Sequence, residues 1–103
     1  MKKKYFSLES HYNSVAYPCS IIEIDSLSIT IIHTFFLCLI KKKIKVNRIK
    51  AIYRDRWFLR NCITFEVWNK KGDTDLYRIF YVNRREEFIS HIKSLNILGT
   101  KLD

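Results

Sequence analysis

A run of basic residues in the middle of the chain is the part of the sequence that could do chemistry. Residues 41–60 hold nine lysines and arginines against Asp55 alone, so nine minus one gives +8 of the formal net charge of +9. Cations gathered in this way bind anions, such as nucleic-acid phosphates, anionic lipid headgroups or an acidic protein. A tryptophan among arginines is typical of an anchor at a binding surface. The candidate residues for binding an anion or a partner are Lys41, Lys42, Lys43, Lys45, Arg48, Lys50, Arg54, Arg56, Trp57 and Arg60.

The same segment also has a purely structural interpretation. Lysines on an edge strand prevent one sheet from pairing with another, so the lysines could form a solvated edge. Trp57 could cap the core, with the neighbouring arginines in solvent. The sequence leaves both alternatives open.

Residue types used in catalysis and metal binding are present, but they form no motif. His11, His33 and His91 have no ligand spacing with one another, with the cysteines or with the carboxylates. Two glycines cannot form a glycine-rich phosphate loop, and no nucleophile elbow occurs. We therefore predict no catalytic residue, no metal site and no cofactor.

The cysteines and the N-terminus bear on the compartment. Cys19, Cys38 and Cys62 are an odd, widely spaced set, as expected of thiols in a reducing compartment. Three lysines follow Met1, but polar residues replace the apolar segment that a signal peptide needs. The longest apolar run, residues 29–40, is shorter than the about 20 residues that span a bilayer. We expect a cytoplasmic protein without a transmembrane segment, and a position at the inner membrane surface stays open.

Alternating hydrophobic residues predict that most of the chain is β-structure. The predicted strands cover 22–25 and 27–31, joined by a turn at Asp25-Ser26, and the apolar run Phe35–Ile40, expected to be a buried strand. The alternation slips in phase near Asn47-Arg48, which indicates a bulge or turn. Strands 62–68 and 76–82 form a hairpin through a loop at 69–73, and Arg54–Arg60 is predicted as a loop. Residues 1–17 allow a strand or a short helix.

After residue 83 the hydrophobic period changes to that of a helix. One apolar stripe contains Phe88, Ile89, Ile92 and Leu95. Asn83 is a suitable N-cap with Glu86 three residues later, and Gly99 suits the C-terminal stop. A chain of 103 residues corresponds to one domain. We predict a single α+β, mainly β domain over residues 1–103, with its helix at 84–98 and residues 1–17 as an unassigned extension.

Three stretches of the sequence resemble bacterial PH-domain-like (pleckstrin-homology-like) proteins. SIIEIDSLSITII (20–32) is similar to their opening hairpin, IKVNRIKAIYR (44–54) to their central strand, and ITFEVWNKKGDTDLYRIFYVNRREEFISHIKSL (63–95) to their closing hairpin and helix. The resemblance covers roughly residues 20–97. It implies a bent antiparallel β-sandwich or partial barrel of six to seven strands, capped by one C-terminal helix. It also implies a binding or scaffolding module. Residues 1–17 and the dense lysines depart from the pattern.

We therefore expect a non-catalytic module that docks a protein partner or an anionic surface through a basic face. One alternative is a small nucleic-acid-binding β protein in which Tyr53, Trp57 or Trp68 stacks on bases. Another is an inhibitor-type protein of a phage or mobile element that binds an acidic partner. Each hypothesis assumes that the cations between residues 41 and 60 form one contiguous exposed patch.

Overall fold

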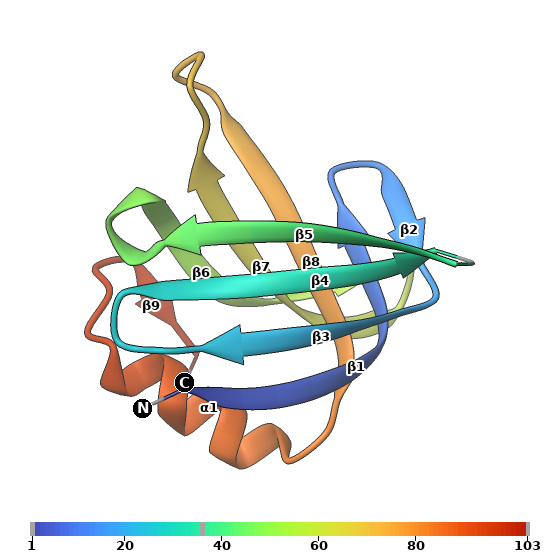
Figure 1. The fold of residues 1–103 in the computed structure, drawn as a ribbon. Coiled ribbons are helices and arrows are strands. Elements are labelled where there is room, and N and C mark those ends of the chain that lie inside the picture. Colours follow the sequence, from blue (N-terminus) through green and yellow to red (C-terminus); the bar gives the residue numbers. More distant parts are fainter. Residues whose placement is uncertain (1, 36, 103) are drawn as a thin grey trace.

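Strands dominate the structure, as the alternating sequence predicts (Figure 1). The computed structural model describes residues 2–35 and 37–102. The elements are β1 (Lys3–Tyr12), β2 (Val15–Tyr17), β3 (Cys19–Ile24), β4 (Ser28–Phe35), β5 (Cys38–Lys45), the 3-10 turn η1 (Val46–Arg48), β6 (Ile49–Trp57), β7 (Arg60–Trp68), β8 (Thr74–Val82), α1 (Arg85–Ser94) and β9 (Thr100–Lys101). The predicted mainly β domain with one C-terminal helix is confirmed. The described strands number nine rather than six or seven.

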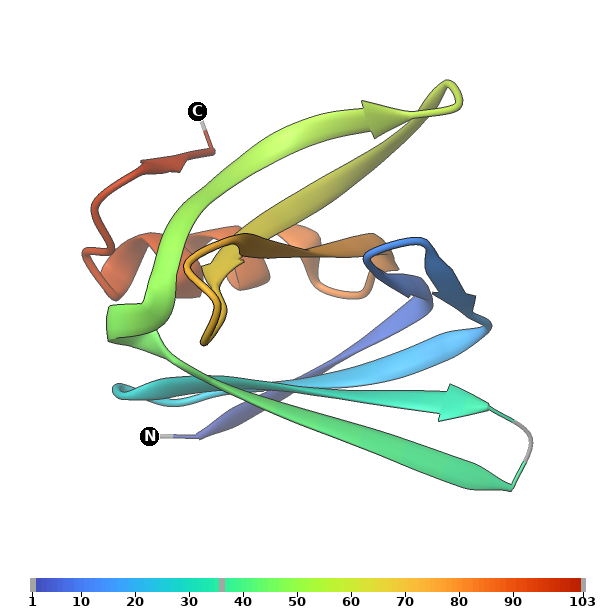
Figure 2. The same ribbon diagram turned by 90° about the horizontal axis from the view of Figure 1, so that it is seen from above.

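All strands belong to one open sheet with the order β5-β4-β3-β1-β8-β7-β6-β9, and β2 pairs with β1 off this path. Neighbours are antiparallel except β6 and β9, which run parallel. The strands β5 and β6 follow each other in the chain, but they lie in opposite halves of the sheet. Figure 2 shows these halves diverging from η1. This topology decides how the basic segment is distributed.

The strand β1, from the segment that the sequence left unassigned, lies at the centre of the sheet. One edge of β1 pairs with β2 and β3, and its other edge pairs with β8. Tyr5 and Ser7 point inward and are buried, whereas Phe6 and Leu8 are exposed. Pro18 lies between β2 and β3 and lacks the N–H that an uninterrupted strand would use.

The core lies between the inner face of the sheet and α1. Isoleucines 22, 24, 29 and 31 alternate along β3 and β4 and are fully buried. The predicted apolar stripe of the helix is confirmed, because Phe88, Ile89 and Ile92 are buried in the same cluster. The Phe88 ring meets the Tyr5 ring edge-on at 5.1 Å. Burial of one such aromatic side chain stabilises the fold by about 1.5–3 kcal/mol.

Both predicted ends of the helix are wrong in detail. Asn83 does not cap α1: its Oδ1 accepts a hydrogen bond from the backbone N–H of Phe6 at 2.8 Å. The N-cap is Arg84, in a left-handed conformation without a side-chain cap. The helix ends at Ser94, and Gly99 lies beyond it. Gly99 has φ +85°, and its carbonyl accepts from the N–H of Ile52 at 3.1 Å, so it seats β9 beside β6.

Two predicted segments contain turns that the sequence pattern conceals. The expected buried strand Phe35–Ile40 is wrong: β4 ends at Phe35, β5 begins at Cys38, and Phe35, Leu37 and Leu39 are exposed. Residue 36 of that run lies outside the described residues. The expected loop Arg54–Arg60 is also wrong, because β6 and β7 continue to a two-residue turn at Phe58-Leu59. Neither turn contains the glycine, proline or asparagine that marks such turns in sequence.

Other predicted turns are confirmed. The Asp25 carboxylate accepts from the backbone N–H groups of Leu27 and Ser28, both at 2.8 Å. The hairpin loop between β7 and β8 closes through a bond from Asn69 N–H to Asp73 O at 2.9 Å. The phase slip corresponds to η1 and to a register shift between Ile49 and Ala51.

Candidate anion-binding groove

The ten residues proposed from the sequence do not share one face. Four lysines lie on β5, Arg48 in η1, the next four residues on β6 and Arg60 on β7. Because β5 and β6 lie in opposite halves of the sheet, the expectation of a single contiguous patch is wrong. The structure instead brings part of the set together with residues from other segments.

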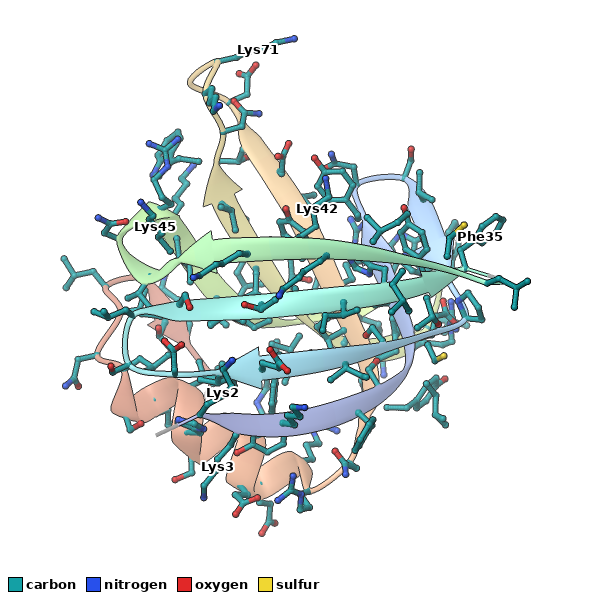
Figure 3. The ribbon with its side chains drawn as sticks, in the orientation of Figure 1. Lys2, Lys3, Phe35, Lys42, Lys45 and Lys71 are labelled. Atoms are coloured by element: carbon teal, nitrogen blue, oxygen red, sulfur yellow. The ribbon has the colours of Figure 1, made fainter. Side chains whose placement is uncertain are left out.

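The basic groove is a hollow of about 540 Å³ between β5 and the β7–β8 hairpin. Five cations and one carboxylate line it, together with aromatic and apolar side chains. The lining residues are Tyr12, Lys42, Lys43, Ile44, Lys45, Arg48, Val67, Trp68, Asn69, Lys70, Asp75 and Tyr77. Figure 3 shows Lys42 and Lys45 along β5 and Lys71 at the tip of the facing hairpin. Lys42, Lys43, Lys45 and Arg48 were candidates from the sequence, whereas Lys70 was missed.

The single carboxylate of the groove is engaged by neutral donors. Asp75 accepts from the hydroxyl of Tyr12 at 3.2 Å and from the amides of Asn13 and Asn69 at 3.4 and 3.3 Å. Burial and Asp75 raise the pKa of Tyr12, so its hydroxyl keeps the proton that it donates. Among the described residues, none of the five groove cations forms a salt bridge. The groove therefore carries an uncompensated positive field.

Aromatic and backbone contacts hold some of these cations in place. The Nζ of Lys42 lies 4.6 Å from the centre of the Tyr12 ring. Arg48 donates to the carbonyl of Trp68 at 3.3 Å, which ties η1 to the end of β7. At the rim, the Nζ of Lys50 lies 5.0 Å from the Trp68 ring and 4.0 Å from Glu66.

The edge of β5 facing away from β4 has no partner strand among the described residues. The N–H of Val46 donates to Leu27 O at 2.9 Å, and hydrogen bonding alternates along an antiparallel pair. It follows from the register that residues 42 and 44 direct their backbone groups toward β4. The backbone N–H and C=O groups of Lys41, Lys43 and Lys45 therefore point toward the open edge.

Two of the other candidates, Trp57 and Arg60, belong to a separate cluster, whereas Lys41 and Arg56 are exposed. Arg60 donates to both carboxylate oxygens of Glu9, at 2.6 and 2.9 Å, and its guanidinium lies 4.7 Å from the Phe80 ring. These bonds from Arg60 hold the pKa of Glu9 below its ordinary value, and His11 acts in the same direction. Trp57 packs edge-on against the His11 ring at 4.6 Å and is only partly exposed. Arg54 donates to the carbonyl of Leu102 at 2.8 Å. Trp57 therefore packs against buried side chains, as the structural interpretation expected, whereas Arg60 is held by Glu9 and is not a solvated flanking charge.

The histidines pack against aromatic rings, His11 against Trp57 and Phe80, and His33 against Tyr17 and Tyr77. His33 is fully buried, with its Nδ1 2.7 Å from the hydroxyl of Ser10 and its ring stacked on Tyr17 at 4.5 Å. Burial lowers the pKa of His33 to about 4. Ser10 is itself fully buried, so this pair faces no solvent. Across residues 2–35 and 37–102, no three histidine, cysteine or acidic side chains gather as a metal site would require.

Comparison with protein-family models, with curated proteins and with solved structures finds no significant match to this chain. In the described part of the chain, no helix has the length and apolar character needed to cross a membrane.

Proposed function

We propose that this chain is a non-catalytic binding module that docks an acidic, extended protein segment through the basic groove. The observation that carries the proposal is the groove itself, which five cations line together with one carboxylate that neutral donors already engage. Coulomb attraction is strongest where cations converge across a concave surface, because field lines concentrate there. An acidic partner would compensate this charge without leaving a buried ion unpaired.

The open edge of β5 favours a peptide strand over other anions. An extended segment can continue the ladder through the backbone groups of Lys41, Lys43 and Lys45, as in β-strand addition. The lysine side chains then act as selectivity elements, because they repel a basic or self-complementary strand. A second copy pairing edge to edge would place these lysines opposite one another, which disfavours a dimer at this site.

One observation supports a second candidate, the binding of single-stranded nucleic acid. Trp68 is 41 % exposed at the groove, and the Nζ of Lys50 lies above its ring. An exposed aromatic ring beside cations is the arrangement on which bases stack. The backbone edge of β5 has no role in this mode, so experiment can separate the two candidates.

We also propose that the domain is a PH-like variant acting in the cytoplasm. The antiparallel sheet, bent at η1, and the single helix after the last long strand support this proposal. The additional strands β1 and β2 come from the segment that departs from the family pattern.

The test is fluorescence anisotropy with a labelled peptide of alternating Glu and Val, and with a labelled oligothymidine, at low and moderate salt. Lys43→Glu/Lys45→Glu should reduce peptide binding by on the order of tenfold or more, since cations near a low-dielectric groove attract strongly. The matched control Arg85→Glu/Lys101→Glu makes the same change in net charge away from the groove, and should retain binding.

A peptide methylated on alternate backbone nitrogens tests the strand pairing. It keeps its carboxylates but cannot form the ladder, so it should bind much more weakly. Equal binding of the methylated peptide would refute pairing with β5. Tighter binding of oligothymidine that is lost in Trp68→Ala would favour the nucleic-acid candidate, and equal effects of both double variants would exclude the groove.

A further inference from the structure

Two hairpin tips at one end of the molecule expose large apolar side chains. At the β6–β7 tip, Phe58 and Leu59 are 78 % and 85 % exposed, and at the β4–β5 tip Leu37 and Leu39 are also exposed. Figures 1 and 2 agree that both tips lie at the end of the molecule opposite η1 and the β3–β4 turn. The Phe58 ring touches the partly exposed Trp57 ring at 4.3 Å, but the exposed fractions show that these side chains lie outside the buried core.

The β6–β7 tip is strained as well as apolar. Phe58 and Leu59 have φ of 48° and 65°, the left-handed conformation that a two-residue turn of this hairpin type requires. Asparagine and glycine adopt it readily, whereas residues with large side chains do so at a cost in stability. Neither the exposed apolar surface nor the left-handed backbone of these two residues stabilises the fold. Such a combination is typical of a site that contacts something outside the chain.

Cations stand behind each tip. Arg56 precedes the β6–β7 tip and Lys41 follows the β4–β5 tip, and both are exposed. The nearby carboxylate of Asp55 accepts from the Arg56 backbone N–H at 2.8 Å and from the Thr64 hydroxyl at 3.2 Å. Each tip thus presents apolar atoms in front and positive charge behind them. An anionic membrane has the complementary order, with charged headgroups above an apolar layer.

We propose that this end of the molecule docks on an anionic bilayer, with Phe58, Leu59 and Leu37 entering the interface between headgroups and acyl chains. Lys41 and Arg56 then contact the headgroup phosphates. The two tips belong to opposite halves of the sheet (Figure 2), so their apolar atoms form two separate contacts and not one patch. A bilayer can receive both at once, whereas a protein hot spot is a single contiguous cluster. This surface is distinct from the basic groove and goes beyond the function proposed above.

The test is co-sedimentation with vesicles of phosphatidylglycerol and phosphatidylcholine, compared with phosphatidylcholine alone. The wild-type chain should sediment with the anionic vesicles only. Phe58→Asn/Leu59→Gly should weaken this partitioning by on the order of tenfold or more, because the variant lacks two apolar side chains that enter the bilayer. The same variant should unfold at a higher temperature, since the new residues suit the turn. Leu37→Ser should weaken partitioning independently.

Leu27→Ser is the matched control, because Leu27 is 77 % exposed in the β3–β4 turn at the opposite end. It should sediment like the wild type. In a Trp68→Phe background, Trp57 fluorescence should shift to the blue on adding anionic vesicles, since the Trp57 ring adjoins Phe58 at 4.3 Å. Unchanged partitioning of the tip variants, or equal loss in Leu27→Ser, would overturn the proposal. So would sedimentation-velocity data showing a wild-type dimer that the tip variants abolish. Retained binding of the acidic peptide by the tip variants would show that the groove acts separately.

Discussion

Replacing Gly99 by alanine should be among the more damaging single changes in the chain. Gly99 has φ +85°, and a Cβ there would collide with the carbonyl oxygen of Lys50 and lie 3.3 Å from the Cα of Ala51. The left-handed backbone alone costs a residue with a Cβ roughly 1–2 kcal/mol. Moving β9 away from β6 breaks the bond between Gly99 and Ile52, worth about 1 kcal/mol. Partial exposure of the buried Leu102 adds about 1–2 kcal/mol, so the total is about 3–5 kcal/mol.

The control for this prediction is Gly72→Ala in the β7–β8 loop. Gly72 has almost the same φ, +88°, but no atom lies within 4 Å of the added Cβ. The free energy of unfolding of this variant should fall only by the cost of placing a Cβ on a left-handed backbone, roughly 1–2 kcal/mol. Urea unfolding followed by tryptophan fluorescence measures both losses, with the slope of the transition compared across variants. Equal destabilisation of the two variants would refute the close approach of β9 to β6.

Two further predictions concern buried polar contacts. The pKa of His33 is about 4, below its ordinary value, so the unfolded chain binds more protons between pH 6.5 and 4. The stability due to neutral His33 is present above pH 6.5 and should fall by up to about 3 kcal/mol toward pH 4. Urea unfolding at a series of pH values should show a weaker dependence of stability on pH for His33→Gln than for the wild type. The same dependence in both proteins would contradict the lowered pKa of His33. Asn83→Ala should destabilise the fold by about 1 kcal/mol. In Asn83→Ala, amide hydrogen exchange should become faster at Phe6 and stay unchanged in the first turn of α1, because the Asn83 side chain accepts from the Phe6 N–H. Faster exchange in α1 alone would instead support Asn83 as the N-cap.

The fold could be predicted from sequence where one face of an element meets the core. Alternation located β3, β7 and β8, and the stripe ending at Leu95 located α1, because burial imposes a period on the residues. Periodicity failed where a tight turn carries apolar residues, as at Phe58-Leu59, since a turn without glycine or asparagine looks like strand. Asn83 failed for another reason: a side chain that suits a cap can instead bind a neighbouring strand, which only the tertiary fold reveals.

Part of the candidate site could also be predicted, but not its boundary. Charge density marked Lys42, Lys43, Lys45 and Arg48 correctly as neighbours, because they are adjacent in the chain. The prediction that the cations after η1 join the same patch was wrong, because the chain crosses there to the other half of the sheet. Lys70 and Asp75 come from a distant hairpin, so no local signal could have placed them in the groove.

The pairing of β1 with β8 has a consequence for biosynthesis. The strand β1 leaves the ribosome well before β8, its neighbour in the sheet, since His11 pairs with Arg78. Until then, the meander β5-β4-β3-β1 has an unpaired edge at β1, a state prone to self-association. Contacts this distant in sequence slow folding, because the chain must lose the entropy of closing a long loop before the contacts stabilise it. We expect the two meanders to form early and the pairing of β1 with β8 to form last. A nascent chain would therefore depend on prompt synthesis of β8 or on a chaperone.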